Sequence, residues 1–288
     1  MTDTLLDLSG TLPTEYIELL ALVKETADRQ QIPLLLIGAT ARNLILRYAH
    51  NIEIKRLTKD IDFGVTVNSW SRFQQLKKQL LATGKFKETK FPHRLIWQSE
   101  IEIETDFVPF GKLESPPGQI TWQEDEFEMS TVGFAEAMES LIRVKLDEGL
   151  ILNVVSLEGL ALLKIISWGD RPTERERDAK DLWLVMNEYL KFNDEQLFGD
   201  TAEHADLLED EDFDYTNAGA RMLGRNISRI ASETTCNIAL SILAEDNRRS
   251  GIYVLTEVIK RAERSFDRED EVLTMWRELL QGISERVD

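Results

Sequence analysis

The feature that most constrains this fold is a change of pattern near residue 156. Before that point, stretches with the two-residue alternation of strands are mixed with stretches of helical period. After it, almost every stretch has helical period. The chain has 288 residues, about twice the usual single-domain length of roughly 150. We therefore predict an α+β protein with two domains: a mixed β-sheet with flanking helices in residues 1–155, and a helical domain in residues 156–288.

The charge of the chain limits what it can bind. Its net charge is −18 at pH 7, which argues against broad neutralisation of nucleic-acid phosphates. Residues 38–94 depart from this average, because they hold twelve Lys and Arg against four Asp and Glu. They form either a solvated helix face with strand ends, or a local positive rim for a polyanion. Residues 200–214 hold eight acidic and no basic residues, and we interpret them as a linker or a solvated face.

The composition also indicates where the protein works. No apolar run approaches the roughly 18–20 residues that span a bilayer, so we expect no membrane segment. The first residues have no basic region and are not expected to form a secretory signal. The single cysteine, Cys236, excludes an internal disulfide and a cysteine-based zinc site. A reducing, cytoplasmic location is the simplest expectation.

A strand–glycine–helix turn is the first candidate for a site. The apolar strand from Pro33 to Ile37 ends at Gly38, and helical period resumes at residue 39. A glycine at such a turn lets backbone N–H groups approach a ligand, and the start of the helix favours phosphate. Turns of this kind are common, so the motif is informative only together with others.

Two acidic patterns follow this turn. Asp60 and Asp62 alternate within an expected strand and therefore share one face. Two adjacent carboxylates repel each other unless a cation lies between them, and carboxylate oxygens are what Mg²⁺ prefers. A later strand presents Glu102, Glu104 and Asp106 on one face. If the two strands are neighbours, Asp106, or else Glu104, can complete a metal site, whereas the alternative is an acidic outer face.

These residues, in this order, resemble the DNA polymerase-β-like nucleotidyltransferase superfamily. Its pattern is an apolar strand, a glycine turn, a helix, an Asp-x-Asp pair and a third carboxylate on a later strand. Gly38, Asp60, Asp62 and Asp106 match it. The resemblance implies a nucleotidyltransferase-type sheet, an NTP substrate, and Mg²⁺ or Mn²⁺ held by the three aspartates.

The turn also looks like the opening motif of the branch that acts on tRNA termini and on poly(A). In that branch a second glycine follows the first, and an Asp follows the Arg. This chain has Ala39 and Asn43 at those positions, with Arg42 between them. The hydroxyl of Thr40 is a candidate for the contact that a family serine would make.

A second group of charged residues lies beyond residue 156. Lys164 falls inside an apolar helical stretch, where a buried lysine is costly unless it is paired with an anion or extends to solvent. Asp178 and Asp181 are three residues apart, so they share a helix face. A solvated helix with intrahelical ion pairs would have much the same sequence.

This second group is similar to the signature of the AbiEii-type toxin family within the same superfamily. That signature is a lysine-bearing helix followed by Arg-Asp-x-x-Asp-Leu on the next helix. Lys164, Arg177, Asp178, Asp181 and Leu182 match it in order. The resemblance covers residues 34–186 and implies a toxin-like nucleotidyltransferase with an antitoxin partner.

The resemblance assigns a role to each matched residue. Asp60 and Asp62 would bridge two metal ions, and Asp106 would bind the ion nearer the acceptor hydroxyl. Lys164 would contact the triphosphate, and either Asp178 or Asp181 would orient Lys164 or the acceptor. The expected nucleotide-binding residues are Gly38, Thr40, Arg42 and Lys164.

Three classes of function remain open from the sequence. The first is an enzyme that transfers a nucleotide from an NTP to RNA, such as a tRNA end, or to a protein. The second uses a small acceptor such as an aminoglycoside. The third is a catalytically silent member that acts as a regulatory partner, and the intact set Asp60, Asp62 and Asp106 argues against it.

Overall fold

The structure is a computed structural model that describes residues 5–49, 60–124, 126–200, 202–209, 213–246, 248, 254–263 and 269–285. The chain divides into two compact units, Met1–Ser156 and Leu157–Asp288. The first contains a mixed β-sheet with helices, and the second is helical in the part described. The predicted α+β class is confirmed.

The first unit is built on an eight-stranded sheet with the strand order β1-β9-β10-β2-β3-β6-β5-β4. A separate hairpin pairs β7 with β8. The strands of the first unit are β1 (Leu5–Asp7), β2 (Leu34–Ile37), β3 (Asp60–Thr66), β4 (Phe86–Glu88), β5 (Arg94–Gln98), β6 (Glu102–Phe110), β7 (Gln119–Thr121), β8 (Glu128–Ser130), β9 (Ile142–Asp147) and β10 (Leu150–Val154). Its helices are α1 (Thr14–Arg29), α2 (Gly38–Asn43), α3 (Trp70–Ala82) and α4 (Phe134–Glu139), and the π-helical segment η1 (Leu44–Ala49) continues α2.

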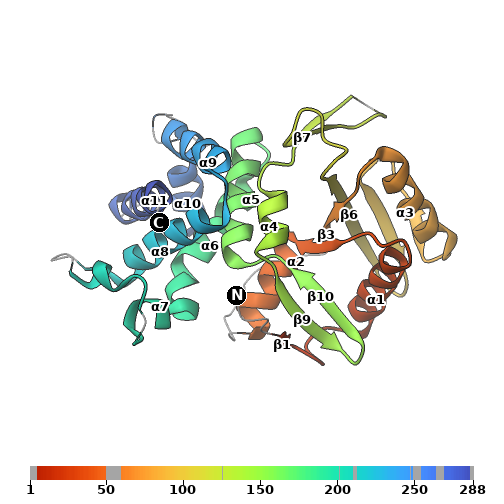
Figure 1. The fold of residues 1–288 in the computed structure, drawn as a ribbon, viewed down its shortest axis with the longest axis horizontal. Helices are drawn as coiled ribbons and strands as arrows, with labels where there is room; N and C mark the ends of the chain where they lie inside the picture. Colours follow the sequence, from red (N-terminus) through yellow and green to blue (C-terminus); the bar gives the residue numbers. More distant parts are fainter. Residues whose placement is uncertain are drawn as a thin grey trace. The chain divides into compact units, whose positions relative to one another are not determined.

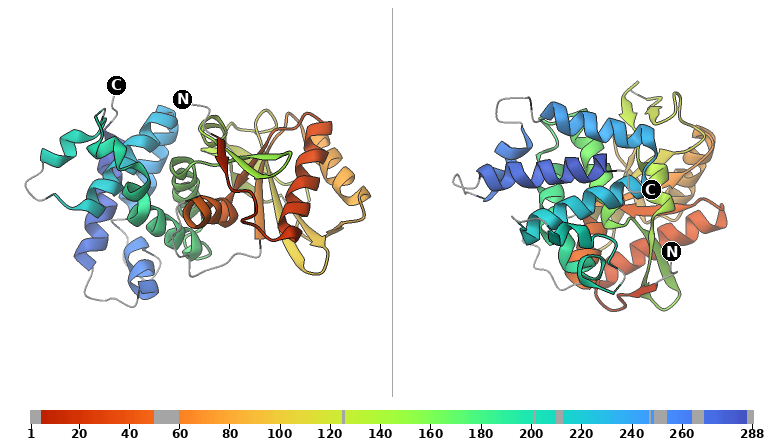
Figure 2. Two further views of the ribbon diagram at one scale, coloured as in Figure 1. Left: turned by 90° about the horizontal axis from the view of Figure 1, so that it is seen from below. Right: turned by 60° about the vertical axis from the view of Figure 1, so that its left-hand side comes forward.

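The helices of the first unit cover different faces of its sheet. Helices α1 and α3 lie on one side of β3 and β6, and α2 and α4 lie on the other (Figures 1 and 2). Side chains alternate between these faces along each strand. On β3 this alternation buries Ile61, Phe63 and Val65 and leaves Asp60 and Asp62 half-buried on the opposite face.

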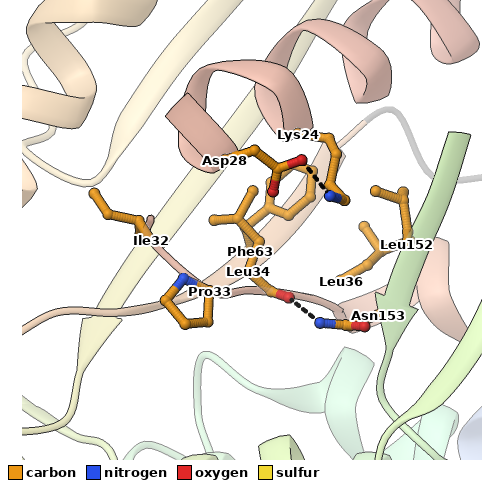
Figure 3. A pocket seen from close by; sticks show the side chains of 9 residues that line it. All are labelled: Lys24, Asp28, Ile32, Pro33, Leu34, Leu36, Phe63, Leu152 and Asn153. Carbon is orange, nitrogen blue, oxygen red and sulfur yellow. Dashed lines mark hydrogen bonds and ion pairs between the residues drawn. The ribbon is translucent and has the colours of Figure 1, made fainter. Parts of the chain in front are cut away.

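The face toward α1 is apolar and closely packed. Figure 3 shows Leu34, Leu36 and Phe63 beneath α1, where a small pocket remains beside the ion pair of Lys24 and Asp28. The walls of this pocket are mainly aliphatic, so it offers few groups for the chemistry predicted from the sequence. The acidic residues belong to the other face.

The second unit packs its helices around α8. Its elements are α5 (Leu157–Asp170), α6 (Glu176–Asn193), α7 (Glu195–Phe198), the 3₁₀ helix η2 (Ala205–Glu209), α8 (Tyr215–Ile230), α9 (Glu233–Asp246), α10 (Leu255–Glu263) and α11 (Glu269–Ser284). Helices α8 and α11 approach closely at two glycines. A Cβ on Gly224 would lie 2.4 Å from the carbonyl oxygen of Leu279, and one on Gly282 would lie 2.2 Å from that of Arg221. Only glycine allows the two backbones to come this near.

The acidic stretch 200–214 is partly folded onto the second unit. Within its described residues, Leu207 is buried and Asp206 forms a bidentate pair with Arg225 of α8. His204 is also buried, with Nε2 3.3 Å from Oδ1 of Asn226. The interpretation as a linker or a solvated face therefore does not hold for His204 and Leu207, which are buried.

Candidate active site

Four carboxylates lie on one face of the central strand pair. Strands β3 and β6 are parallel, and their register pairs Asp60 with Glu104 and Asp62 with Asp106. Residues paired in register on neighbouring strands share a face, as do residues two apart on one strand. We call Asp60, Asp62, Glu104 and Asp106 the carboxylate face. The predicted neighbourhood of the two acidic strands is thus present in the structure.

Gly38 lies directly against this face. It has a φ of +70°, and a Cβ at this position would be only 2.0 Å from Oδ2 of Asp62. The sequence interpretation gave this glycine the role of admitting a ligand phosphate. In the structure, the missing side chain makes room for the carboxylate of Asp62. Helix α2 has only six residues before η1 begins, so its start is not a phosphate site by itself.

Thr40 and Arg42, the other predicted nucleotide-binding residues of this turn, have partners inside the protein. The hydroxyl of Thr40 donates a hydrogen bond of 2.9 Å to the backbone oxygen of Asp60. Arg42 is 2% exposed, and its guanidinium donates to Oδ1 of Asn43 from Nε and Nη2. The hydrogen bond of Thr40 ties α2 to the start of β3, whereas the contacts of Arg42 with Asn43 lie within α2.

Arg94, which the sequence analysis did not single out, binds the third predicted ligand. Its Nε donates to Oδ1 of Asp106 over 2.6 Å and its Nη2 to Oδ2 over 2.7 Å, while Nη1 donates to Glu104. The pKa of Arg94 is raised above its usual value, first by the hydrogen bonds with Asp106, and burial lowers it less. The register of β5 against β6 pairs Arg94 with Asp106, and no local sequence signal reveals that pairing.

The carboxylate face supplies the right donor types for a divalent cation, but its side chains are not gathered around one point. Within the described ranges, no three His, Cys, Asp or Glu side chains are arranged to hold a metal ion. The oxygens of Asp106 accept hydrogen bonds from Arg94. By donor type and shared face the four carboxylates fit Mg²⁺ or Mn²⁺, and a metal ion at Asp106 would have to displace Arg94.

The second predicted group forms a compact cluster within the helical unit. Nζ of Lys164 on α5 lies 2.5 Å from Oδ1 of Asp178 and 3.1 Å from Oδ2 of Asp181, both on α6. We call these three residues the buried lysine cluster, because their side chains are 12%, 8% and 5% exposed. Burial lowers the pKa of Lys164, but the charges of the two aspartates raise it more, so the net shift is upward. Lys164 therefore does not extend to solvent, and both aspartates contact it.

Two of the three histidines, His93 and His204, lie within the described residues. The ring of His93 lies between those of Phe91 and Trp122, with centroid distances of 5.8 and 5.6 Å. His204 is buried in the helical unit. His50 lies outside the described residues.

The sequence of the chain matches one protein family over most of its length. The family model described as "Nucleotidyl transferase AbiEii toxin, Type IV TA system" matches residues 21–285, well over half of the chain. The chain belongs to this AbiEii family. It is a nucleotidyltransferase, and the resemblance seen in its sequence is confirmed.

Several solved structures are similar to this AbiEii-family chain, and none of the curated proteins searched matches it. An antigenic nucleotidyltransferase-like protein from Paracoccidioides brasiliensis is 17% identical with a TM-score of 0.41, over 60% of this chain and 75% of that one. The antibiotic-resistance factor ANT(2'')-Ia is 15% identical with a TM-score of 0.36, and the match covers 68% of this chain and 99% of that one. A CCA-adding enzyme in complex with ATP is 16% identical with a TM-score of 0.32, and the match covers 96% of this chain and 68% of that one.

The helices of this AbiEii-family protein were also compared with the length and hydropathy of membrane spans. In the part of the chain that the structure describes, none is long and apolar enough to cross a bilayer.

Proposed function

We propose that the protein transfers a nucleotide from an NTP to an acceptor hydroxyl, that residues 1–155 form the catalytic domain, and that residues 156–288 form a helical domain. The observation that carries the proposal is the parallel register of β3 and β6, which pairs Asp62 with Asp106. Asp60 shares their face, and Gly38 leaves room for Asp62. Carboxylate oxygens are the donors that Mg²⁺ and Mn²⁺ prefer, and these three lie on one face.

Each aspartate has a distinct role in this proposal. Bound metal ions would stabilise both the attacking oxygen of the acceptor and the leaving oxygen of pyrophosphate. Asp60 and Asp62 would hold both ions, and Asp106 would hold the ion nearer the acceptor. Asp106 would also assist removal of the proton from the acceptor hydroxyl. Thr40 supports these roles, because its hydrogen bond fixes the backbone of Asp60.

We propose that Lys164 contacts the triphosphate as a point charge. The two aspartates that contact it, Asp178 and Asp181, would keep the ammonium charged and its position fixed. The upward shift in the pKa of Lys164 supports this role, since a charged ammonium is what a phosphate requires.

For the acceptor we propose an RNA end, such as a tRNA end. Lys85, Lys87 and Lys90 are exposed on and beside β4, the neighbour of β5 in the sheet. Phe91 is 43% exposed, with Nζ of Lys90 5.0 Å and the guanidinium of Arg94 5.7 Å from its ring centre. An exposed aromatic ring flanked by cations is a surface on which unstacked RNA bases bind. Further cations of this rim, Lys55, Arg56 and Lys59, lie outside the described residues.

A small, aminoglycoside-like acceptor is the second candidate. The observation that favours it is the net charge of −18, which attracts a polycation and weakens a long contact with RNA. An RNA acceptor would accordingly use a short contact of about two to four phosphates. We also propose that an antitoxin counteracts the activity and that the reaction takes place in the cytoplasm, where the buried free thiol of Cys236 would stay reduced.

The test is a labelling experiment with the full chain. The protein is incubated with Mg²⁺, each NTP labelled at its α-phosphate, and either total tRNA or a mixture of aminoglycosides. We expect label on tRNA, and loss of that label in Asp62→Asn. Label on an aminoglycoside alone would select the second candidate, and no labelled acceptor in any mixture would contradict a transferase role for these substrates.

Charge reversal on β4 separates the two acceptors further. We expect Lys87→Glu together with Lys90→Glu to weaken tRNA labelling, with little change in NTP binding. RNA affinity should fall with salt at a slope of about −0.7 per phosphate contacted. Lys112→Glu is the matched control, because Lys112 is exposed in the same unit but is not on β4 or β5. A small acceptor predicts that none of these changes matters.

A further inference from the structure

Arg94 occupies the position where the sequence places a metal ligand. It donates to both carboxylate oxygens of Asp106, over 2.6 and 2.7 Å, and its third nitrogen donates to Glu104. Two parallel hydrogen bonds between a guanidinium and a carboxylate form the strongest ordinary pairing of these groups. The side chain of Arg94 is 23% exposed and that of Asp106 is 14%, so solvent screens the pair only in part.

The sheet register makes this contact a built feature of the fold. Arg94 pairs with Asp106 across β5 and β6, and Asp106 pairs with Asp62 across β6 and β3. The three side chains therefore stand in one row on one face of the sheet. On its other side, the guanidinium of Arg94 lies over the ring of Phe91. Arg94 is thus held at the edge of the carboxylate face by both of its neighbours.

We propose that Arg94 is a place-holding cation, which occupies Asp106 until a divalent metal ion takes over that carboxylate. The inference rests on the proposed function, because it treats Asp106 as a metal ligand. It goes further by giving a residue outside the aspartate triad control over metal affinity.

Competition between the two cations has a measurable consequence. A metal ion that binds Asp106 must first break two charge-assisted hydrogen bonds, and it then lies near the positive charge of Arg94. Both effects reduce the affinity of the carboxylate face for a free metal ion. Removing the guanidinium should therefore tighten metal binding, although the protein without metal loses an ion pair.

The experiment measures Mn²⁺ binding to the full chain without NTP, by the loss of the free-ion electron paramagnetic resonance signal. We expect Arg94→Gln to bind Mn²⁺ on the order of tenfold more tightly than the wild type. Arg94→Lys keeps the charge but not the paired hydrogen bonds, so it should lie between the two. Arg143→Gln is the matched control, because it removes one exposed positive charge on β9, four strands away from β6, and should change nothing.

Thermal unfolding provides a second readout. Arg94→Gln should unfold at a lower temperature than the wild type without metal, and Mn²⁺ should raise its midpoint by more than it raises that of the wild type. A folded Arg94→Gln protein with equal or weaker Mn²⁺ binding would overturn the inference and make Arg94 a positioning residue for Asp106. Absence of saturable Mn²⁺ binding in both proteins would instead refute the proposed metal site, and the inference with it.

Discussion

The two units each contain a long cationic side chain that contacts two carboxylates, but the two groups differ in burial. On the carboxylate face, Arg94 contacts Asp106 and Glu104 at an edge where Glu104 is 50% exposed. In the buried lysine cluster, all three side chains are at most 12% exposed. The first arrangement can exchange its cation with solvent or a ligand. The second is largely buried within the helical unit, and its ionic contacts hold α5 and α6 together.

The difference shows that residue type alone does not separate a partly exposed charge cluster from a buried one. A partly exposed ion pair contributes little to stability, because solvent screens it. A buried pair contributes little net energy as well, but removal of one member leaves an uncompensated charge. Substitutions in the two clusters should therefore affect different properties.

The largest effect is expected on activity, from the carboxylate face. Asp62→Asn should lower the rate of nucleotide transfer by about 10³-fold, because metal stabilisation of the transition-state charge is worth several kcal/mol. Its unfolding free energy should stay the same or rise slightly, since one of several adjacent like charges is removed. Rates of α-labelled nucleotide transfer and urea unfolding curves check both parts.

Glu102→Gln is the control for this substitution. It also removes one carboxylate from β6, but Glu102 is exposed and lies two residues beyond the pair of Glu104 with Asp60. Its activity should be close to that of the wild type. If the Asp62→Asn enzyme were as active as Glu102→Gln, the carboxylate face would take no part in nucleotide transfer.

The next effect is on stability, from the buried lysine cluster. A methionine is close to Lys164 in size but carries no charge. We expect Lys164→Met to lose about 3–5 kcal/mol of unfolding free energy, because Asp178 and Asp181 keep their charges without the ammonium. Denaturant unfolding measures this loss, and Arg94→Gln should cost at most about 1 kcal/mol in the same assay.

A triple variant sharpens this test. Lys164→Met with Asp178→Asn and Asp181→Asn removes all three charges, so much of the lost stability should return. If Lys164→Met alone were as stable as the wild type, the cluster would not be closed to solvent.

A substitution at Gly38 tests how the carboxylate face is positioned. Gly38→Ala would place a Cβ 2.0 Å from Oδ2 of Asp62, in addition to the cost of a positive φ. We expect a fall in transfer rate of about tenfold or more together with a loss of about 1–3 kcal/mol in stability. Gly84→Ala is the matched control, because Gly84 has a φ of +71° but no heavy atom within 4 Å of the added Cβ. Equal effects of the two substitutions would show that backbone strain alone is responsible.

The smallest expected effect is a pH dependence in the helical unit. Burial lowers the pKa of His204, and the positive charges of Arg229 and Arg225 lower it further. A hydrogen bond with Asn226 and the charge of Glu203 raise the pKa, but the net shift is downward. The folded protein therefore favours the neutral ring, and the unfolded chain binds the proton first as pH falls. Stability from His204 is complete above 6.5, the usual value, and decreases as pH falls below it.

Urea midpoints at pH 7.5, 6.5 and 5.5 check this expectation. The midpoint of the wild type should fall with pH, and that of His204→Gln should fall less. Asp206 cannot produce the same trend, because hydrogen bonds from Arg225 lower its pKa below 3.8 and its contribution is lost only in more acid solution. A wild-type midpoint that does not change over this range would contradict the prediction.

Local signals in the sequence accounted for the elements that carry the site. The alternation in β3 placed Asp60 and Asp62 on one face, and the spacing of Asp178 and Asp181 placed both on one helix face. These predictions succeeded because the period of a strand or helix is set by neighbouring residues. The four strands that the sequence did not reveal, β1, β4, β7 and β8, have three residues each, too few for a period to show.

The partners of the charged residues depended on contacts far apart in the chain. The pairing of Asp62 with Asp106 and of Arg94 with Asp106 follows from strand register, which no local pattern fixes. The hydrogen bond of Thr40 to Asp60 and the ion pair of Lys164 with Asp178 likewise join different elements of the chain. Sequence reasoning therefore found most of the candidate residues but missed Arg94, the cation that contacts two of them.

The strand order also bears on how the enzyme is made on the ribosome. Strand β2 pairs with β10, and β1 pairs with β9. These partner strands lie more than a hundred residues later in the chain, so they are the last strands of the sheet to be synthesised. At roughly 5–20 residues per second, a nascent chain spends several seconds with β3 and β6 synthesised but this side of the sheet incomplete. The side of the sheet formed by β1, β9 and β10 therefore assembles only after the hairpin of β9 and β10 has emerged.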